Sequence, residues 1–387
     1  MTIYQLFERE DIYSIIEITL KEYFFDVHGI NTDVRLTNNK FRNHFVVYPR
    51  IGIIISRVPT WEVMKHVYAD FNVQGSTLRK IIAWGYITLC WCTFGLMGSR
   101  TLYVSSKKAL HRNISIMACN RKIRIFDFKN RFVDAIIKVG YHDYYFKNEI
   151  KARTTLNYPF IPCIDKIGPR WYREKILDGS GLVRTAPGKY EKYCNEVLSD
   201  IRKLYIDYGS SITLSDYANR LDETLRKGIK QLHINKGITD LTYLESIKNK
   251  TLDLLRNDDM SVPITLSHGD LQTGNIIVDE KQDKVTIYDW ETFGERSVWF
   301  DCSRLLLYSV RRENFIHMVN QYEDKEIKDS LLILDNNKNR NMKQVVAVLV
   351  LEDMIFRIDE VVDLPGKIGT EGIIHLENTL KEITWLN

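Results

Sequence analysis

The sequence lacks the patterns that mark several large protein classes. Six cysteines occur in 387 residues without a CxxC pair, so a cysteine-based zinc site or a disulfide framework has no support. There is no G-x-x-x-x-G-K-[ST] loop, which argues against a P-loop nucleotide hydrolase. The 54 basic and 50 acidic side chains leave a net charge of +4, too small to indicate nucleic acid as a partner. With no secretory signal at the N-terminus, we expect a cytoplasmic protein with reduced thiols.

Long uncharged stretches are also scarce. One of them, Ile81–Gly98, extends over eighteen residues, which just meets the length of a membrane-spanning helix. Its three glycines, two threonines and two cysteines make it only moderately apolar. We therefore predict a buried helix and do not favour a membrane partner, with a peripheral or membrane-inserted helix as the alternative.

The distribution of apolar and polar residues divides the chain into three regions. Residues 1–105 form an N-terminal α/β extension without a chemical motif. Residues 106–178 carry short β-branched runs and one helix-like segment, which predicts a small β-rich lobe. Residues 179–387 show helix-spaced apolar positions around two apolar runs joined by a charged turn, which predicts a helical lobe with an inserted β-hairpin. The expected fold is therefore α+β and two-lobed, as in protein-kinase-like proteins.

The clearest motif is the segment His268-Gly-Asp-Leu-Gln-Thr-Gly-Asn275, which fits the H-x-D-L-x-x-x-N spacing of a kinase catalytic loop. Phosphoryl transfer needs a carboxylate that receives the proton of the acceptor hydroxyl, and Asp270 can do this. Asn275 offers a neutral oxygen ligand to Mg²⁺, and Asp289 returns beside it at the end of the predicted hairpin. His268 would pack beneath the loop and support it. A polar surface loop in an unrelated helical protein is the alternative interpretation.

The nucleotide side of the site is less complete. Lys138 ends an apolar run, Ala135-Ile-Ile-Lys138, that is close to the V-A-I-K pattern of a nucleotide-binding lysine. A buried ammonium needs a partner, and Glu149 in the following helix is the predicted one. An edge-strand lysine and a solvated glutamate are the alternatives. The turn Ala118–Lys122 contains no glycine, so the glycine-rich loop of a kinase is missing there.

A glycine-rich segment, Asp178-Gly-Ser-Gly181, follows the last predicted strand of the small lobe. We interpret it as the linker between the lobes, with a phosphate-binding turn as the alternative. The strand before it would then present backbone groups to adenine, and Ile176 is the candidate for that contact.

Three segments together resemble the aminoglycoside phosphotransferase and choline kinase superfamily: Ser267–Ile277, Ile287–Glu291 and Phe300–Leu306. The resemblance covers about residues 106–310 and implies a protein-kinase-like fold that uses ATP and Mg²⁺. It also implies that Asp301 braces the loop from below. It implies that Asp270 is the catalytic base and that Asn275 and Asp289 bind magnesium. It further implies that Lys138 and Glu149 form a pair that orients ATP.

The span after Asp289 indicates a small acceptor rather than a peptide. A protein kinase needs an extended segment and an A-P-E motif to dock a peptide, whereas here Asp301 and an apolar helix follow within about a dozen residues. Acidic side chains are candidates for a pocket that receives a cationic acceptor. The candidates are Glu291, Glu295, Glu352, Asp353 and Glu360. For the last three we prefer the interpretation as solvated helix charges.

The sequence thus predicts an ATP- and Mg²⁺-dependent phosphotransferase that acts on a hydroxyl of a small molecule, such as an aminoglycoside, an amino alcohol or a sugar-like metabolite. The alternative is a nucleotide-binding pseudokinase, or an accessory protein of cell-envelope polysaccharide assembly. The missing glycine-rich loop favours this alternative, and the intact Asp270, Asn275 and Asp289 oppose it.

Overall fold

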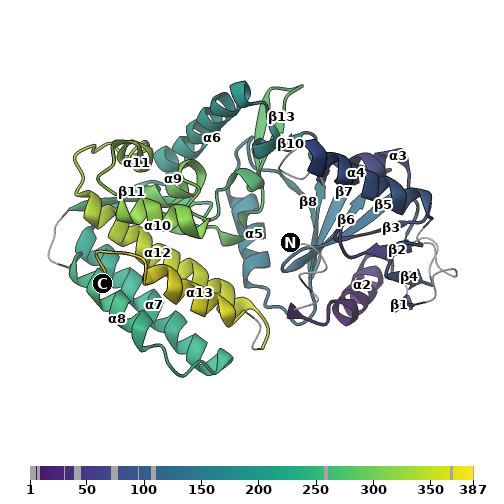
Figure 1. The fold of residues 1–387 in the computed structure, drawn as a ribbon, viewed down its shortest axis with the longest axis horizontal. Coiled ribbons are helices and arrows are strands. Elements are labelled where there is room, and N and C mark those ends of the chain that lie inside the picture. Colours follow the sequence, from purple (N-terminus) through teal and green to yellow (C-terminus); the bar gives the residue numbers. More distant parts are fainter. Residues whose placement is uncertain are drawn as a thin grey trace. The chain divides into compact units, whose positions relative to one another are not determined.

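The computed structural model describes residues 6, 9–29, 31–38, 45–70, 77–94, 96–105, 110–256, 260–366 and 369–386 (Figure 1). The chain divides into two compact units. The first consists of Met1–Asp143 and Cys163–Leu177, and the second of Tyr144–Pro162 and Asp178–Asn387. The division between Leu177 and Asp178 falls where the sequence predicts a linker.

The first unit is built on a nine-stranded sheet in which neighbouring strands are antiparallel, with the order β1-β4-β2-β3-β5-β6-β7-β9-β8. Short β-branched runs form these strands, as expected from their propensity. Their bounds are β1 Val34–Thr37, β2 Phe45–Tyr48, β3 Ile53–Ser56, β4 Arg100–Val104, β5 Ile114–Ala118, β6 Lys122–Asp127, β7 Phe132–Ile137, β8 Ile164–Ile167 and β9 Trp171–Lys175.

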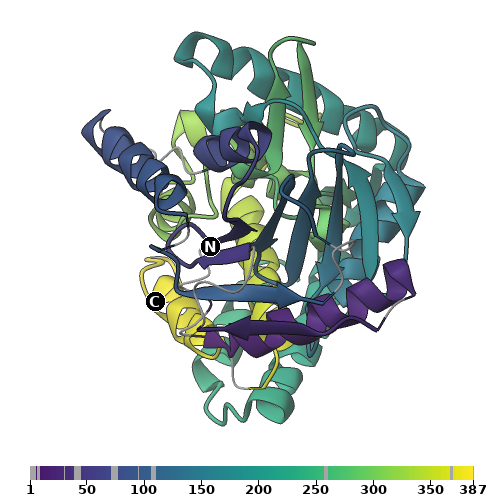
Figure 2. The ribbon, with the colours of Figure 1, turned by 90° about the vertical axis from the view of Figure 1, so that its right-hand side faces the viewer.

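Helices cover both faces of this sheet. On β2, Phe45 and Val47 belong to the core beneath α2 (Ile12–His28), whereas Val46 and Tyr48 belong to the core beneath α3 (Trp61–Asp70) and α4 (Thr77–Cys92). This alternation follows from the two-residue period of a strand. Figures 1 and 2 show α2 and α4 on opposite sides of the strands.

Two predictions for the N-terminal part differ from this structure. Residues 1–105 are not a separate extension, because β1–β4 continue the sheet that β5–β9 begin, through the pairing of β3 with β5. The predicted buried helix over 81–98 is also wrong, because α4 ends at Cys92 and exposes Ile81, Ile82 and Trp84. Residue 95 of that stretch lies outside the described residues.

The second unit is mainly helical. Its longest helices are α6 (Pro187–Tyr208), α7 (Leu214–Lys236) and α12 (Met342–Asp363), and α12 packs along α7. Shorter helices complete the core: α5 Tyr144–Thr155, α8 Thr242–Asp253, α9 Val298–Leu306, α10 Arg312–Asn320, α11 Lys325–Leu331 and α13 Glu371–Leu380. Leucine, isoleucine and valine side chains of α7, α8 and α12 form one continuous buried cluster, which explains their helix-spaced apolar pattern.

Two small sheets interrupt these helices. One has the order β10-β13-β14 and the other β11-β12-β15. The predicted hairpin is the antiparallel pair β13 (Ile276–Asp279) and β14 (Lys284–Ile287). The other strands are β10 Ser180–Gly181, β11 Ser210–Thr213, β12 Ser261–Ser267 and β15 Gly294–Ser297.

The α+β fold class, with one β-rich and one helical part, is confirmed. Within the described parts of the chain, no helix combines the length and apolar character needed to cross a membrane.

Candidate active site

The loop from His268 to Asn275, here called the 268–275 loop, leaves the end of β12 and leads into β13. Asp301 on α9 accepts hydrogen bonds from the backbone amides of His268 at 2.8 Å and Gly269 at 3.0 Å, one with each carboxylate oxygen. Asp301 is buried, so these charge-assisted bonds are shielded from water. Its contacts are those of a residue that braces the loop.

Gly269 is required by its backbone and its surroundings. Its φ is +82°, and a Cβ atom there would lie 2.4 Å from the carbonyl oxygen of Thr292 and 2.5 Å from a guanidinium nitrogen of Arg296. Thr292 in turn donates its hydroxyl to the carbonyl of His268 at 3.0 Å. The loop is therefore packed closely against the segment that follows the hairpin.

His268 is fully buried, and both of its ring nitrogens are engaged. Nε2 lies 3.0 Å from the carbonyl oxygen of Tyr288, and Nδ1 lies 3.2 Å from the backbone amide of Asp270. Nε2 must therefore carry the proton and Nδ1 must accept one, which is the neutral tautomer. With no free nitrogen, His268 supports the loop and is not placed to take a proton from a substrate.

Asp270 and Asn275 face one another across the loop. The side-chain amide of Asn275 donates to the Asp270 carbonyl at 2.9 Å and to its Oδ2 at 3.1 Å, and Gln272 donates to the same Oδ2 at 2.9 Å. Within the described residues, Oδ1 of Asp270 has no hydrogen-bond donor. One carboxylate oxygen is thus fixed and the other is available to a ligand, and the amide orientation of Asn275 leaves its carbonyl oxygen for a cation.

The hairpin returns Asp289 to this loop. Ile276 pairs with Ile287, the amide of Tyr288 donates to the Asn275 carbonyl at 3.0 Å, and the Tyr288 hydroxyl donates to the Gly274 carbonyl at 2.7 Å. Asp289 follows directly with φ +66°, in the left-handed region that is unfavourable for a residue with a side chain.

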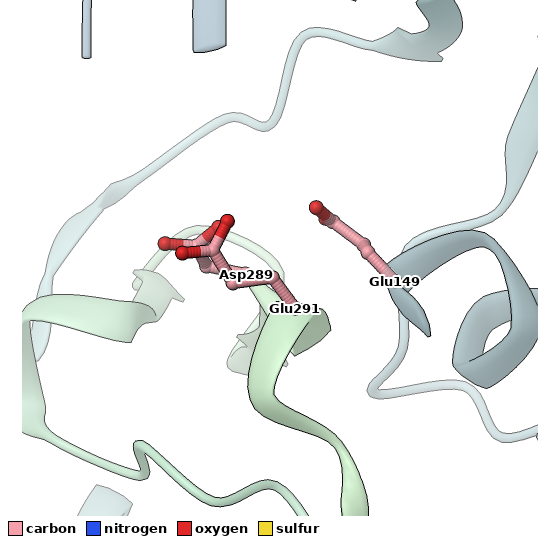
Figure 3. A group of neighbouring side chains, drawn as sticks. All are labelled: Glu149, Asp289 and Glu291. Atoms are coloured by element: carbon pink, nitrogen blue, oxygen red, sulfur yellow. The ribbon is translucent and has the colours of Figure 1, made fainter. Parts of the chain in front are cut away.

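Three carboxylates gather where the hairpin ends. Glu149 on α5, Asp289, and Glu291 in the short helix η3 (Trp290–Thr292) bring oxygen atoms within 4.8 Å of one another (Figure 3). Asp289 and Glu291 lie side by side in Figure 3, and Glu149 points toward them from its helix. A set of hard oxygen ligands at this spacing suits Mg²⁺. The sequence predicts Asp289 here as a metal ligand, but it predicts other roles for Glu149 and Glu291.

Contacts of α5 hold Glu149 in this position. Asn148 donates its side-chain amide to the carbonyl oxygens of Glu291 at 2.9 Å and Phe293 at 2.6 Å. Arg153, one turn after Glu149, donates to its carboxylate at 3.2 Å. The helix is therefore fastened to the segment that carries Asp289.

A cavity of about 320 Å³ lies beside the loop within the second unit. Thr292 and Arg296, which pack against Gly269, form one wall, and α5, α7 and α12 form the others. Aromatic side chains, three carboxylates and two guanidinium groups contribute to the lining, among them Tyr144, Tyr145, Tyr217, Phe356, Glu295, Glu352, Asp359, Arg220 and Arg296.

Two of the carboxylates that line the cavity, Glu352 and Asp359, lie on α12. Glu352 is buried and accepts hydrogen bonds from the Tyr217 hydroxyl and from the amide and hydroxyl of Ser297, so it is not a solvated helix charge. Burial raises its pKa to about 7 despite these donors. Asp359 was missed by sequence reasoning, and burial raises its pKa to about 6. A spacing of seven residues, two helical turns, puts both on one face of α12 and is the signal that marks them together.

The remaining acidic candidates have other surroundings. Asp353 is also buried rather than solvated, and it pairs with Arg304 at 2.8 Å and Arg357 at 2.7 Å. Glu295 lines the cavity but pairs with Arg220 at 3.1 Å, and both of these side chains are exposed.

Residues 209–329 match the model described as the phosphotransferase enzyme family. The predicted family resemblance is confirmed for this segment. The phosphotransferase segment runs from β11 to α11 and includes the 268–275 loop, the hairpin, η3 and Asp301. No curated protein sequence matches the chain significantly.

Solved structures of several kinases are similar to the chain at low sequence identity. Ethanolamine kinase from Plasmodium vivax is 12% identical over 83% of this chain and 94% of its own, with a TM-score of 0.48. An ADP-bound aminoglycoside phosphotransferase is 15% identical over 69% and 93%, with a TM-score of 0.43. Choline kinase from Cryptosporidium parvum is 12% identical over 72% and 92%, with a TM-score of 0.41.

Lys138, which lies outside the phosphotransferase segment, has a carboxylate partner within the first unit. Its ammonium contacts Glu10 at 2.7 Å and the Asn120 carbonyl at 3.0 Å, and the side chains of Lys138 and Glu10 are 0% and 1% exposed. Burial lowers the pKa of Lys138, and Glu10 opposes this shift. Glu10, 128 residues away in sequence, is therefore the carboxylate that the lysine contacts within the first unit, and the pairing with Glu149 of the second unit stays a prediction.

The predicted adenine contact is also constrained. The backbone amide of Ile176 donates to the Arg131 carbonyl at 3.1 Å, within the first unit. A nucleotide could therefore use the carbonyl of Ile176 but not its amide.

Proposed function

We propose that the chain is an ATP- and Mg²⁺-dependent phosphotransferase that phosphorylates a hydroxyl of a small, cation-bearing molecule. The observation that carries the proposal is Asp270, with Oδ2 fixed by Gln272 and Asn275 and Oδ1 without a donor in the described residues. The family match of residues 209–329 supports the same class of reaction.

Asp270 would act as the base. Its Oδ1 accepts the proton of the acceptor hydroxyl while the hydroxyl oxygen forms a bond to the γ-phosphorus of ATP, and the bond to the bridging oxygen of ADP breaks. Asn275 holds Asp270 in place, and Asp301 holds the loop. A proton acceptor fixed in this way contributes about 10²–10⁴-fold to the rate.

The residues that would hold the metal are Asp289 and Asn275, with Glu149 and Glu291 beside them. The three carboxylates have oxygen atoms within 4.8 Å of one another, and hard oxygen donors of this kind fit a divalent cation. Mg²⁺ bound there would neutralise charge on the phosphate oxygens of ATP.

The cavity supports a small acceptor. Its volume of about 320 Å³ lies at the lower end of the range for ligand pockets, which favours an amino alcohol over an aminoglycoside or a larger sugar derivative. Asp359 and the aromatic rings of Tyr217 and Phe356 provide negative charge and π faces for an ammonium group. ATP is the proposed donor, and the cytoplasm, where ATP is available, is the proposed location.

The test is an acceptor screen. Purified protein, ATP and Mg²⁺ are incubated with ethanolamine, choline, monosaccharides and aminoglycosides, and phosphate adducts are detected by mass. We expect one class to be phosphorylated, with a loss of about 10²–10⁴-fold in Asp270→Asn. Glu280→Gln, on the hairpin turn away from the loop, is the matched control and should keep full activity.

A nucleotide-binding pseudokinase, or an accessory protein of polysaccharide assembly, is the second candidate. The glycine-free turn between β5 and β6 favours it. Tight ATP binding without transfer to any acceptor, and without an effect of Asp270→Asn, would support this candidate and contradict the first.

A further inference from the structure

The solvent-facing side of α4 is apolar. Leu78, Ile81, Ile82 and Leu89 are 66%, 58%, 63% and 48% exposed, while Ala83, Ile87 and Cys90 on the opposite side are buried. The helical period places the four exposed side chains on one stripe, here called the α4 stripe. A helix of a water-exposed surface normally carries charge on such a stripe, but from Ile81 to Cys92 there is none.

Aromatic side chains border the stripe. Trp84 is 47% exposed, and Trp91 stacks on Trp61 of α3 with ring centroids 6.2 Å apart. The exposed ammonium of Lys65 lies 5.7 Å above the Trp61 ring. Phe94, Leu96 and Met97, which follow the helix in the sequence, are also exposed. Tryptophan is enriched where proteins meet the headgroup region of a membrane.

Basic residues outnumber acidic residues in the sequence segment that contains this helix. Between Arg50 and Arg100 the sequence has six basic and two acidic residues, and this excess equals the net charge of +4 of all 387 residues. Arg50 is exposed and lies close enough to Tyr86 of α4 to lower its pKa, although burial, the larger effect, raises that pKa. An apolar stripe beside cations is complementary to a surface with an apolar interior and anionic headgroups.

We propose that the α4 stripe docks on an anionic lipid surface, with α4 lying in the plane of the interface. The helix has 16 residues and does not qualify as a membrane span, so docking would be peripheral. Buried apolar area and electrostatic attraction would act together, because either signal alone gives only weak and reversible binding. This proposal does not depend on the phosphotransferase activity.

Sedimentation with extruded vesicles tests it. The full chain is mixed with vesicles of phosphatidylcholine alone or with about 30% phosphatidylserine, which gives the vesicles a negative surface. We expect clear binding to the anionic vesicles, weaker binding at high salt, and a loss of more than about tenfold in Ile81→Ser/Ile82→Ser. Ile206→Ser is the matched control, because Ile206 is 72% exposed on α6 and lies outside the stripe.

Three outcomes would overturn the proposal. They are no binding to anionic vesicles, equal loss in the Ile206→Ser control, and a dimer in solution that Ile81→Ser/Ile82→Ser converts to a monomer. The last result would assign the stripe to a second copy of the chain. Circular dichroism of each variant, unchanged from that of the parent protein, shows that the fold is intact.

Discussion

Replacement of Lys138 by methionine should destabilise the first unit. Lys138 and Glu10 form a buried pair, and removal of one partner from such a pair costs about 3–5 kcal/mol. Glu10 would still accept hydrogen bonds from the hydroxyl of Tyr141 and from Arg9 at 3.3 Å. The carboxylate is therefore not left without donors, and we expect a cost near the lower end, about 3 kcal/mol.

The reverse change, Glu10→Met, should cost more. It leaves the Lys138 ammonium buried with the Asn120 carbonyl as its acceptor in the described residues, and close to the cation of Arg9, which further lowers its pKa. We expect about 4–5 kcal/mol. The double variant removes both charges and should cost clearly less than the sum of the single changes, because a buried ion pair can be replaced by apolar side chains at little cost.

Urea unfolding followed by circular dichroism measures these differences, with separate transitions assigned to the two units if they unfold independently. Steady-state kinetics at varied ATP supplies the second reading. If Lys138→Met leaves the unfolding midpoint unchanged but raises KM for ATP at least tenfold, the lysine binds nucleotide and its role in stabilising the first unit is refuted. If Lys138→Met and Glu10→Met lower the free energy of unfolding equally, the expected larger effect of Glu10→Met is refuted.

Three further predictions concern the second unit. Gly269→Ala should abolish activity and destabilise the protein by more than about 1 kcal/mol, because the added Cβ would lie 2.4 Å from the Thr292 carbonyl oxygen and φ is +82°. Kinetics and thermal unfolding measure the two effects. Gly188→Ala is the control, because a Cβ atom there would meet no other atom within 4 Å. Glu149→Gln should raise the Mg²⁺ concentration for half-maximal activity about tenfold, whereas a magnesium titration without change would remove Glu149 from the metal site. For a cationic acceptor, KM should fall as pH rises through about 6–7, since Asp359 and Glu352 gain charge above their raised pKa values, and Asp359→Asn should flatten this profile. The same shift means that the folded state holds the Glu352 proton more tightly than the unfolded chain, so stability should decrease as pH rises from about 4.5 to about 7.

The 268–275 loop and its hairpin could be predicted because their geometry is local. Asp270, Asn275 and Asp289 lie within twenty residues, and an antiparallel pair with a short turn determines where the last of them returns. Strands β5–β9 were found for a similar reason, since short β-branched runs and their turns are visible along the chain.

Features that depend on distant packing could not be predicted. The partner of Lys138 comes from a segment 128 residues earlier, and nothing near Lys138 indicates it. Glu352 was interpreted as solvated because it is charged, yet its burial follows from the packing of α12 against α7, which brings Tyr217 to its carboxylate. The apolar residues of α4 predicted burial, but whether a face of a helix is covered depends on which elements reach it.

The N-terminal hundred residues are an integral half of the first unit rather than an appended module. Strands β1–β4 extend the sheet from the edge of β5, and α2 covers the core formed by residues of both halves, such as Leu36 and Ile125. Glu10, Arg9 and Lys138 then join the start of the chain to the end of β7. Without these elements β5 would become an open edge and the core beneath α2 would be exposed to water, two features that promote aggregation. The added strands also support α3 and α4 on the other face of the sheet. The α4 stripe therefore belongs to the N-terminal residues, which lie outside the kinase-like sequence pattern.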